Sequence, residues 1–258
     1  MHFTDTHCHL AEAVLQADWP NVLAAAEAAG VTRFIVPATR PQDWQAVLDF
    51  PEKPSEKARI HRAAGIHPWF AAETEEGDWQ RLEALLAAHP QLWVGEIGLD
   101  ALKTERADGA QQQAVLIRQL VLAQQYRRRV IVHNVKAGAA LAAAVKAAKF
   151  TQGGIIHAFS GSAEEARQLI GLGFYIGIGS LLLNPAAKKI RVTLKQLPLE
   201  RIVLETDSPF MLKNAVNTPA NIRAIAAEAA QILGIGIDTL ARQTEANTDR
   251  LLAAFQTA

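Results

Sequence analysis

The sequence predicts an α/β protein whose eight parallel strands and their helices close into a (β/α)8 TIM barrel. Three observations support this fold class. Short β-branched or apolar runs alternate with segments of helical period from one end of the chain to the other. Eight such units fit into 258 residues, and about 32 residues per unit is close to the length of a βα repeat. The first predicted turn also lacks the glycine-rich sequence typical of an open doubly wound sheet, the structural alternative.

Each predicted strand is a short run rich in β-branched and apolar residues, bounded by turn-forming residues. In chain order, these runs are Phe3–His7, Arg33–Pro37, Ile60–Gly65, Leu92–Glu96, Val130–His133, Gly154–Phe159, Phe174–Ile178 and Ile202–Glu205. Because every strand is followed by a helical segment, neighbouring strands are predicted to run parallel.

Several of the intervening helical segments have recognisable ends. Ser162-Ala163-Glu164-Glu165 has the sequence of a capping box, in which the first and last side chains each satisfy a free backbone amide. Asn184-Pro185 and Thr218-Pro219 each place a cap residue before a proline at the first helical position. Gly30 and Gly171 are predicted to end their helices in the left-handed conformation.

Composition excludes several classes of protein. Half of the residues are hydrophobic and 20% are charged, which excludes a disordered, collagenous or coiled-coil chain. The 26 basic and 26 acidic side chains balance, so a broad basic surface for nucleic acid is not expected, although a small cationic pocket for a few phosphates stays possible. The single cysteine, Cys8, excludes an intrachain disulfide and fits a reducing compartment.

No apolar run reaches the roughly 18 residues needed to span a bilayer, and the N-terminus has no secretory signal pattern. We therefore expect a cytoplasmic monomer whose residues 1–258 form a single domain. Neither a membrane nor an obligate protein partner is expected.

The side chains able to perform chemistry gather at the C-terminal ends of the predicted strands. They are His7, His9, Glu96, His133, His157 and Asp207. In a barrel these ends meet at one face, which carries the active site. His7 and His9 are two residues apart in an extended segment, so both are predicted to point into the barrel mouth. Cys8 then points the other way and is expected to be a buried small hydrophobic residue.

Taken singly, each of these residues has a structural interpretation. A lone histidine is usually a core or surface residue with its hydrogen bonds satisfied, and Asp207 before Ser208-Pro209 could start a turn. Together they favour a metal site, because this much buried charge is costly unless ions or partners neutralise it. His2, His61 and His89 lie outside the convergent positions and are predicted to be structural.

Six nitrogen and oxygen donors exceed the three protein ligands of a typical catalytic zinc, so two divalent ions are expected. Two ions about 3.5–4 Å apart, bridged by a carboxylate and a water, form a hydrolytic site. Glu96 is the expected bridge because its carboxylate has two oxygens, and Asp207 could bind one ion and accept a proton from the attacking water. Zinc, manganese, iron and magnesium stay open as the metal, although magnesium prefers fewer histidines.

Six motifs lie in order along the chain: Thr4-Asp5-Thr6-His7-Cys8-His9-Leu10, Gly65-Ile66-His67-Pro68, Gly95-Glu96-Ile97-Gly98-Leu99-Asp100, Val132-His133, Ile156-His157-Ala158-Phe159-Ser160-Gly161-Ser162 and Glu205-Thr206-Asp207-Ser208-Pro209-Phe210. Together they resemble the TatD family of metal-dependent deoxyribonucleases, which belongs to the amidohydrolase superfamily. The resemblance extends from the first strand to the last helix and implies a TIM barrel that hydrolyses phosphodiester bonds in DNA.

The resemblance also implies a distribution of the ligands between two ions. His7, His9, Glu96 and Asp207 would surround one ion, and Glu96, His133 and His157 the other. It places His67 near the substrate.

The sequence departs from the family pattern where substrate contacts are expected. Asn134-Val135-Lys136 follows the fifth-strand histidine, where the family has a small residue, an arginine and an acid. Ala101-Leu102-Lys103 replaces family aromatic residues, and Val216 replaces an arginine. Arginine binds phosphate through two hydrogen bonds and aromatic rings stack on bases, so a weaker grip on DNA is expected. Lys136, and also Lys103, are candidate substitutes.

Three functions therefore remain open from the sequence. The first is hydrolysis of a phosphodiester, with DNA as the substrate that the resemblance implies. The second is the same barrel and ions acting on another ester, a lactone or an amide, because one fold supports many reactions. The third is a barrel that binds nucleic acid or metal without turnover, although a purely structural metal site would not need Asp207.

Overall fold

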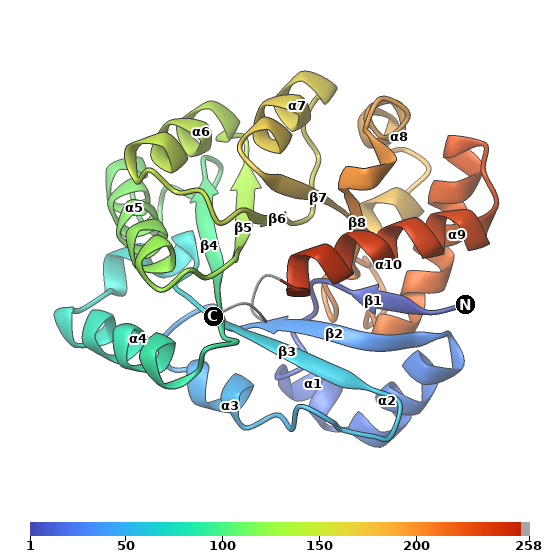
Figure 1. Cartoon of the computed structure of the whole chain (residues 1–258), viewed down its shortest axis with the longest axis horizontal. Coiled ribbons are helices and arrows are strands. Elements are labelled where there is room, and N and C mark those ends of the chain that lie inside the picture. The colour runs from blue at the N-terminus through green and yellow to red at the C-terminus, as the bar shows by residue number, and fades with distance from the viewer. Residues whose placement is uncertain (254–258) are drawn as a thin grey trace.

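The structure is a computed structural model that describes residues 1–253, and Figure 1 shows its arrangement. Eight parallel strands pair in sequence order from β1 to β8. They are β1 Phe3–Asp5, β2 Val31–Pro37, β3 Arg59–Ala64, β4 Trp93–Asp100, β5 Val130–Val135, β6 Gly154–Ile156, β7 Phe174–Ile178 and β8 Ile202–Leu204. The predicted TIM-barrel fold is confirmed.

The ring closes where the first and last strands meet. Just after β1, the backbone amide and the hydroxyl of Thr6 both donate to the Leu204 carbonyl of β8, each at 3.0 Å. The Asp207 amide donates to the His7 carbonyl at 2.9 Å. These bonds hold the ends of β1 and β8 side by side, so residues about 200 positions apart in sequence share one rim.

Helices surround the strands (Figure 1). In residues 1–253, the α-helices are α1 Ala13–Gln16, α2 Trp19–Ala28, α3 Trp44–Leu48, α4 Glu76–Ala88, α5 Gly109–Gln125, α6 Gly138–Ala147, α7 Ala163–Gly171, α8 Lys188–Leu194, α9 Ile222–Leu233 and α10 Ile237–Ala253. Short 3-10 helices are η1 Pro68–Glu73, η2 Ser180–Leu183, η3 Leu199–Arg201 and η4 Pro219–Asn221. Within that range no single helix has the length and apolar character to cross a membrane; Pro219–Leu233 and Ile237–Ala253 pass only as a pair bent by 109°.

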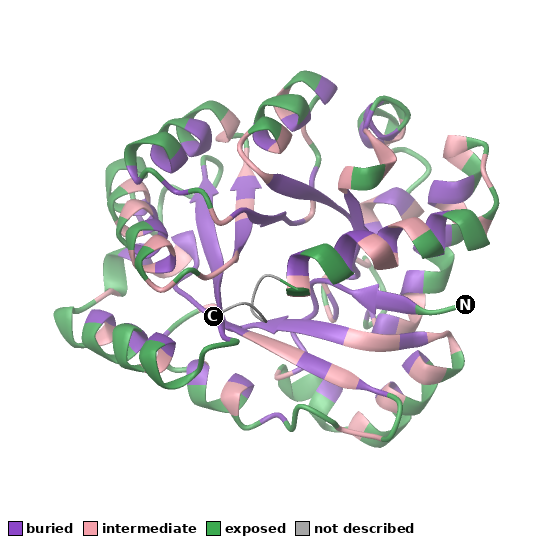
Figure 2. Ribbon diagram, viewed as in Figure 1, coloured by how far each residue is buried: buried purple, intermediate pink, exposed green. Residues whose placement is uncertain are grey.

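Most strand residues are buried, as the mainly purple strands in Figure 2 show, and the half-buried ones lie chiefly on β2 and β3. One apolar layer fills the space between strands and helices. A second, smaller cluster fills the barrel interior and comprises Ile35, Ala63, Trp93, Ile131, Ile155, Tyr175, Val203 and Leu251. Leu251 belongs to α10, so this helix closes the end of the barrel opposite the predicted site.

Strand β4 is longer than the sequence predicted, because it ends at Asp100 and not at Glu96. Its pairing with β5 shifts between Val94 and Ile97 and then continues to Asp100. Glu96 therefore lies inside the strand, at the pairing irregularity, and not at the strand end. Gly98 has φ +145°, and a Cβ there would lie 1.9 Å from the His133 carbonyl oxygen, so only glycine allows this close approach of β5.

One predicted capping box and one predicted helix start differ in the structure. Ser162 accepts a hydrogen bond from the Glu165 amide at 3.2 Å, but the Glu165 carboxylate accepts from Asn134 Nδ2 at 2.9 Å. Only half of the predicted capping box forms. After Asn184-Pro185, the helix begins at Lys188, because Asn184 caps a local turn instead.

The predicted helix ends agree in part. Gly30 has φ +89° just beyond Ala29, the C-cap of α2, as predicted. Gly171 is the last residue of α7, and the left-handed conformation falls on Gly173, with φ +95°. Thr218-Pro219 does start a helix, the 3-10 turn η4 that leads into α9.

Candidate metal centre

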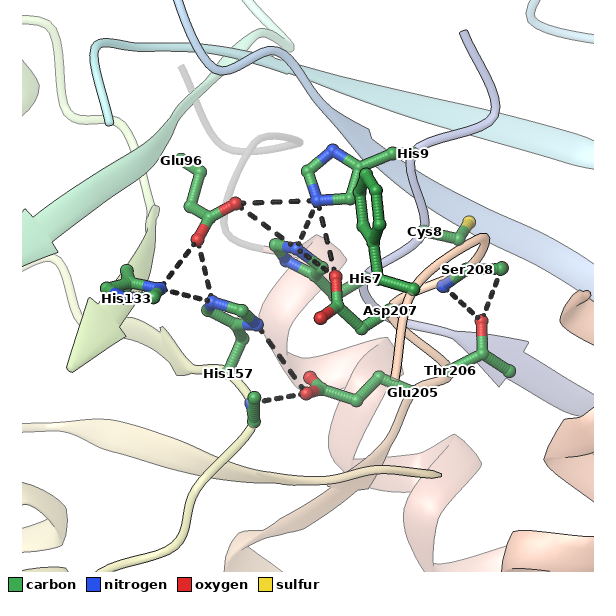
Figure 3. A network of polar contacts seen from close by, with 12 residues as sticks. His7, Cys8, His9, Glu96, His133, His157, Glu205, Thr206, Asp207 and Ser208 are labelled. Carbon is green, nitrogen blue, oxygen red and sulfur yellow. Dashed lines mark hydrogen bonds and ion pairs between the residues drawn. The ribbon is translucent and has the colours of Figure 1, made fainter. Parts of the chain in front are cut away.

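All six predicted ligands meet at the C-terminal mouth of the barrel (Figure 3). They come from β4 and β5 and from the segments that follow β1, β6 and β8, and His67, after β3, joins them. Their side chains are between 0% and 14% exposed. The site is thus a buried cluster of imidazoles and carboxylates assembled from strands across the whole chain.

The first donor group lies on the β1 side. His7 Nε2 and His9 Nε2 are 3.0 Å apart. Glu96 Oε2 lies 3.4 Å from His7 and 3.5 Å from His9, while Asp207 Oδ1 lies 3.5 Å and 3.3 Å from the same nitrogens. Four donor atoms from four side chains therefore face one point.

The second donor group lies on the β5 side and uses the other oxygen of Glu96. Oε1 is 3.2 Å from His133 Nδ1 and 2.7 Å from His157 Nε2. The two imidazole nitrogens are 3.3 Å apart. The Glu96 carboxylate thus points one oxygen at each group, the arrangement that a bridging ligand requires.

These spacings fit bound ions. Around an ion with bonds of about 2.0–2.1 Å, tetrahedral ligand atoms lie about 3.3–3.4 Å apart. The distances within the first group, 3.0–3.5 Å, are close to that value. The facing nitrogens of His7 and His9, 3.0 Å apart, need a proton or a cation between them, because two unprotonated lone pairs repel. The cluster can therefore hold metal.

Asp100 fixes which nitrogen of His133 faces Glu96. Asp100 Oδ2 lies 3.1 Å from His133 Nε2 and accepts from the Trp69 indole N–H at 2.8 Å. A proton on His133 Nε2 satisfies Asp100 and leaves the Nδ1 lone pair free to bind metal. Burial disfavours ionisation, but hydrogen bonds from His133, Trp69 and Leu102 lower the pKa of Asp100 to about 2, so this carboxylate stays ionised.

His67 differs from the other histidines in its hydrogen bonding. Its Nδ1 accepts from the Trp69 backbone amide at 3.2 Å, at the start of η1. A neutral imidazole with an accepting Nδ1 carries its proton on Nε2, and that atom is 3.3 Å from Glu96 Oε1. In this tautomer His67 donates to Glu96, and the donor atoms of His67, Glu96 and His133 are also close enough together to hold an ion.

Electrostatics keep the carboxylates of the cluster ionised. Burial alone would raise the pKa of both carboxylates. The surrounding histidines nevertheless hold the pKa of Glu96 well below its usual range, and contacts with His9 and His7 lower the pKa of Asp207. Burial lowers the pKa of His7 to about 4, so its imidazole is neutral at pH 7 and able to bind metal.

Two further buried carboxylates were not predicted to have a role. Asp5 accepts from the Thr206 amide at 2.9 Å and from the Thr206 hydroxyl at 2.5 Å, which fixes β1 to the Asp207 segment. Glu205 accepts from the Ala158 amide and lies 3.8 Å from His157 Nδ1 (Figure 3). Burial raises the pKa of Asp5 to about 7 and that of Glu205 to about 8. Both residues stand inside motifs that contain a candidate ligand, and that proximity was the available signal.

Backbone strain marks the same rim. Asp207 has φ +57° and Ala158 has φ +44°, a conformation that non-glycine residues adopt rarely. Lys136 has the same left-handed conformation, with φ +55°, and its exposed side chain follows β5 directly.

Cys8 is fully buried with its thiol 3.8 Å from the Ile35 carbonyl, on the other side of its segment from His7 and His9.

A TIM barrel with imidazoles and carboxylates gathered at this face has the architecture of the metal-dependent hydrolase barrels. The chain matches the family described as TatD related DNase over residues 4–253. It is 34% identical to the "Uncharacterized metal-dependent hydrolase YjjV" of Escherichia coli K12 over 85% of this chain and 84% of that protein. The crystal structure of YjjV, a TatD homologue, superimposes with a TM-score of 0.89 at 31% identity, covering 96% of this chain and 97% of the other.

A further relative is the "3'-5' ssDNA/RNA exonuclease TatD" of Edwardsiella piscicida, which is 30% identical over 96% of this chain and 98% of that protein. The chain belongs to the TatD family of metal-dependent hydrolases.

Proposed function

We propose that the protein hydrolyses phosphodiester bonds, with DNA as substrate, at a site that holds two divalent ions. The observation that carries this proposal is the Glu96 carboxylate, whose two oxygens face two separate donor groups 2.7–3.5 Å away. His7, His9, Glu96 and Asp207 would hold one ion, and Glu96, His133 and His157 the other.

Divalent ions bound there would polarise a phosphoryl oxygen and lower the pKa of water enough to supply a nucleophile at neutral pH. Asp207 stays ionised and touches the imidazoles through Oδ1. It is therefore the residue able to accept the proton that the attacking water loses. The strained backbone at Asp207 fixes its side chain toward His7 and His9.

Two residues are proposed to contact the substrate. The Nε2–H of His67 points into the cluster and can donate to a phosphoryl oxygen that approaches Glu96. Lys136, exposed at the end of β5, can supply a positive charge to a neighbouring phosphate. The family description and the relative named as an exonuclease support a nucleic-acid substrate. The alternative is the same site acting on another ester, a lactone or an amide.

Metal-loaded protein should be assayed on single-stranded DNA labelled at the 3′ or the 5′ end, on a nitrophenyl phosphodiester, and on carboxyl esters and a lactone. The proposal predicts cleavage of DNA and of the nitrophenyl diester, abolished in His7→Ala. Turnover confined to the carboxyl esters or the lactone would replace phosphodiester hydrolysis with the alternative.

A further inference from the structure

Arg106 is an exposed cation on the rim of the barrel mouth. It lies in the loop between β4 and α5, six residues beyond Asp100. Its guanidinium carbon sits 4.8 Å from the centre of the Trp69 ring. We propose that Arg106 binds a non-scissile phosphate of a single-stranded nucleic acid and that Trp69 positions it. This inference rests on the proposed function and names the substrate class of the same site.

Trp69 is held firmly beside the metal centre. Its indole N–H donates to Asp100 Oδ2 at 2.8 Å, the same oxygen that meets His133 Nε2. Its ring also packs edge-on against His67, with ring centres 4.9 Å apart. Arg106 is therefore stacked on a ring whose position is fixed relative to the His133 donor group.

The stacking orients Arg106 without consuming its hydrogen-bonding capacity. A guanidinium that lies over an aromatic ring uses its flat face, and its in-plane N–H groups remain able to bind phosphate through two bonds. Within residues 1–253, Arg106 forms no ion pair with a carboxylate. Its charge is consequently available to an anionic substrate.

A neighbouring arginine provides the contrast. Arg40 lies over Phe70, the other aromatic residue of η1, with 5.2 Å between the guanidinium carbon and the ring centre. Asp43 Oδ1 is 3.3 Å from Arg40 Nε and compensates its charge. Lys103, in the same loop as Arg106, likewise pairs with Glu105 at 3.7 Å. Of these three rim cations, Arg106 is the one without an acidic partner.

This arrangement compensates for arginines that the family pattern has and this sequence lacks. Val135 and Val216 replace them. Arg106 supplies a guanidinium from a different loop to the same face, beside the Glu96–His133 half of the cluster. A strand whose scissile phosphate lies at the cluster can then place a neighbouring phosphate against Arg106.

The test uses metal-loaded protein and a fluorescein-labelled thymidine oligonucleotide with a hydrolysis-resistant phosphorothioate backbone, whose binding is followed by anisotropy at several salt concentrations. Arg106→Ala is expected to raise the Kd about tenfold. It should also reduce the magnitude of the slope of log Kd against log salt by about 0.7, the value of one phosphate contact on a single strand. Arg106→Lys should keep the slope and recover part of the affinity.

Arg40→Ala is the matched control, because it removes the same charge from a neighbouring aromatic residue of the rim. It is expected to leave the Kd within about twofold of the parent, since Arg40 is already paired. An Arg106→Ala protein with the parent Kd and salt slope, or an equal loss in Arg40→Ala, would overturn the proposal.

The two proposals fail separately. If the protein cleaves DNA in a metal-dependent reaction but Arg106→Ala binds the oligonucleotide as the parent does, the Arg106 subsite is rejected and phosphodiester hydrolysis is retained. Oligonucleotide binding that depends on Arg106, in a protein that cleaves no phosphodiester, retains the binding subsite and rejects the proposed reaction.

Discussion

Among single residues, Glu96 has the most central position in the cluster, because its carboxylate faces both donor groups. Its Oε2 faces His7 and His9, and its Oε1 faces His133 and His157. A bridging carboxylate could be predicted from the sequence because, among side chains, aspartate and glutamate alone offer two equivalent oxygens. Glu96 lies at the pairing irregularity in β4, and the sequence contains no sign of that irregularity.

Glu96→Gln should lower the affinity of both donor groups for metal, because the amide loses the charge and offers one oxygen in place of two. His157→Ala should chiefly empty the second group. The measurement is metal content by mass spectrometry after dialysis against a defined concentration of Mn²⁺. Glu96→Gln protein with the full metal content of the parent would refute the bridging role.

Asp100→Asn should weaken metal binding about 10- to 100-fold, the usual effect of losing the carboxylate behind a metal-binding histidine. The reason is that His133 Nε2 and the Trp69 N–H both depend on Asp100 Oδ2. Affinity can be measured by competition with a chromophoric chelator, with Asp43→Asn as a control on the same rim. Equal affinity in parent and Asp100→Asn would show that His133 needs no such support.

For individual elements, β4 shows what sequence patterns can and cannot predict. Its start, and the existence of all eight strands, followed from apolar runs between turn residues. Its end was placed four residues too early, because Gly98 breaks the apolar pattern although β5 packs against it. Half of the capping box at Ser162 failed for a related reason: Asn134, distant in sequence, binds the Glu165 side chain.

Gly98→Ala should destabilise the fold by about 3 kcal/mol or more, because the new Cβ would collide with the His133 carbonyl at a positive φ. Gly77→Ala is the matched control, since nothing lies within 4 Å of a Cβ there and alanine favours helix α4. It should stabilise by about 0.5 kcal/mol. Urea unfolding of the three proteins measures both effects, and a Gly98→Ala protein as stable as Gly77→Ala would contradict the packing argument.

His61 on β3 should make the fold sensitive to acid. Burial, together with Arg33, lowers the pKa of His61 to about 4, while the unfolded chain binds the proton near pH 6.5. Between those values the unfolded state holds more protons, so the free energy of unfolding falls as the pH falls. The parent should lose up to about 2 kcal/mol through His61 between pH 7 and pH 5, and His61→Gln should not. Urea unfolding at the two pH values tests this, and identical losses in both proteins would contradict it.

In the whole molecule, barrel closure brings chemistry together from distant parts of the chain. His7 and Asp207 are neighbours because β1 and β8 meet, joined by the bond between the Asp207 amide and the His7 carbonyl. Strict strand–helix alternation predicted this convergence, and therefore the membership of the cluster. The position of Arg106 at the barrel rim could not be predicted in the same way, because its contact with Trp69 depends on the conformations of η1 and of the loop between β4 and α5. The sequence alone therefore indicated a weakened grip on DNA, whereas the structure places Arg106 at that rim with no carboxylate paired to it among residues 1–253.

The number of ions is the central claim, and a titration tests it most directly. Chelator-stripped protein should be titrated with Mn²⁺ while bound metal and hydrolysis of a nitrophenyl phosphodiester are followed together. Because the two donor groups share Glu96, we expect activity to stay low when one equivalent of Mn²⁺ is bound and to rise until two equivalents are bound. Full activity at a single tightly bound equivalent, with no further rise, would contradict the two-ion site.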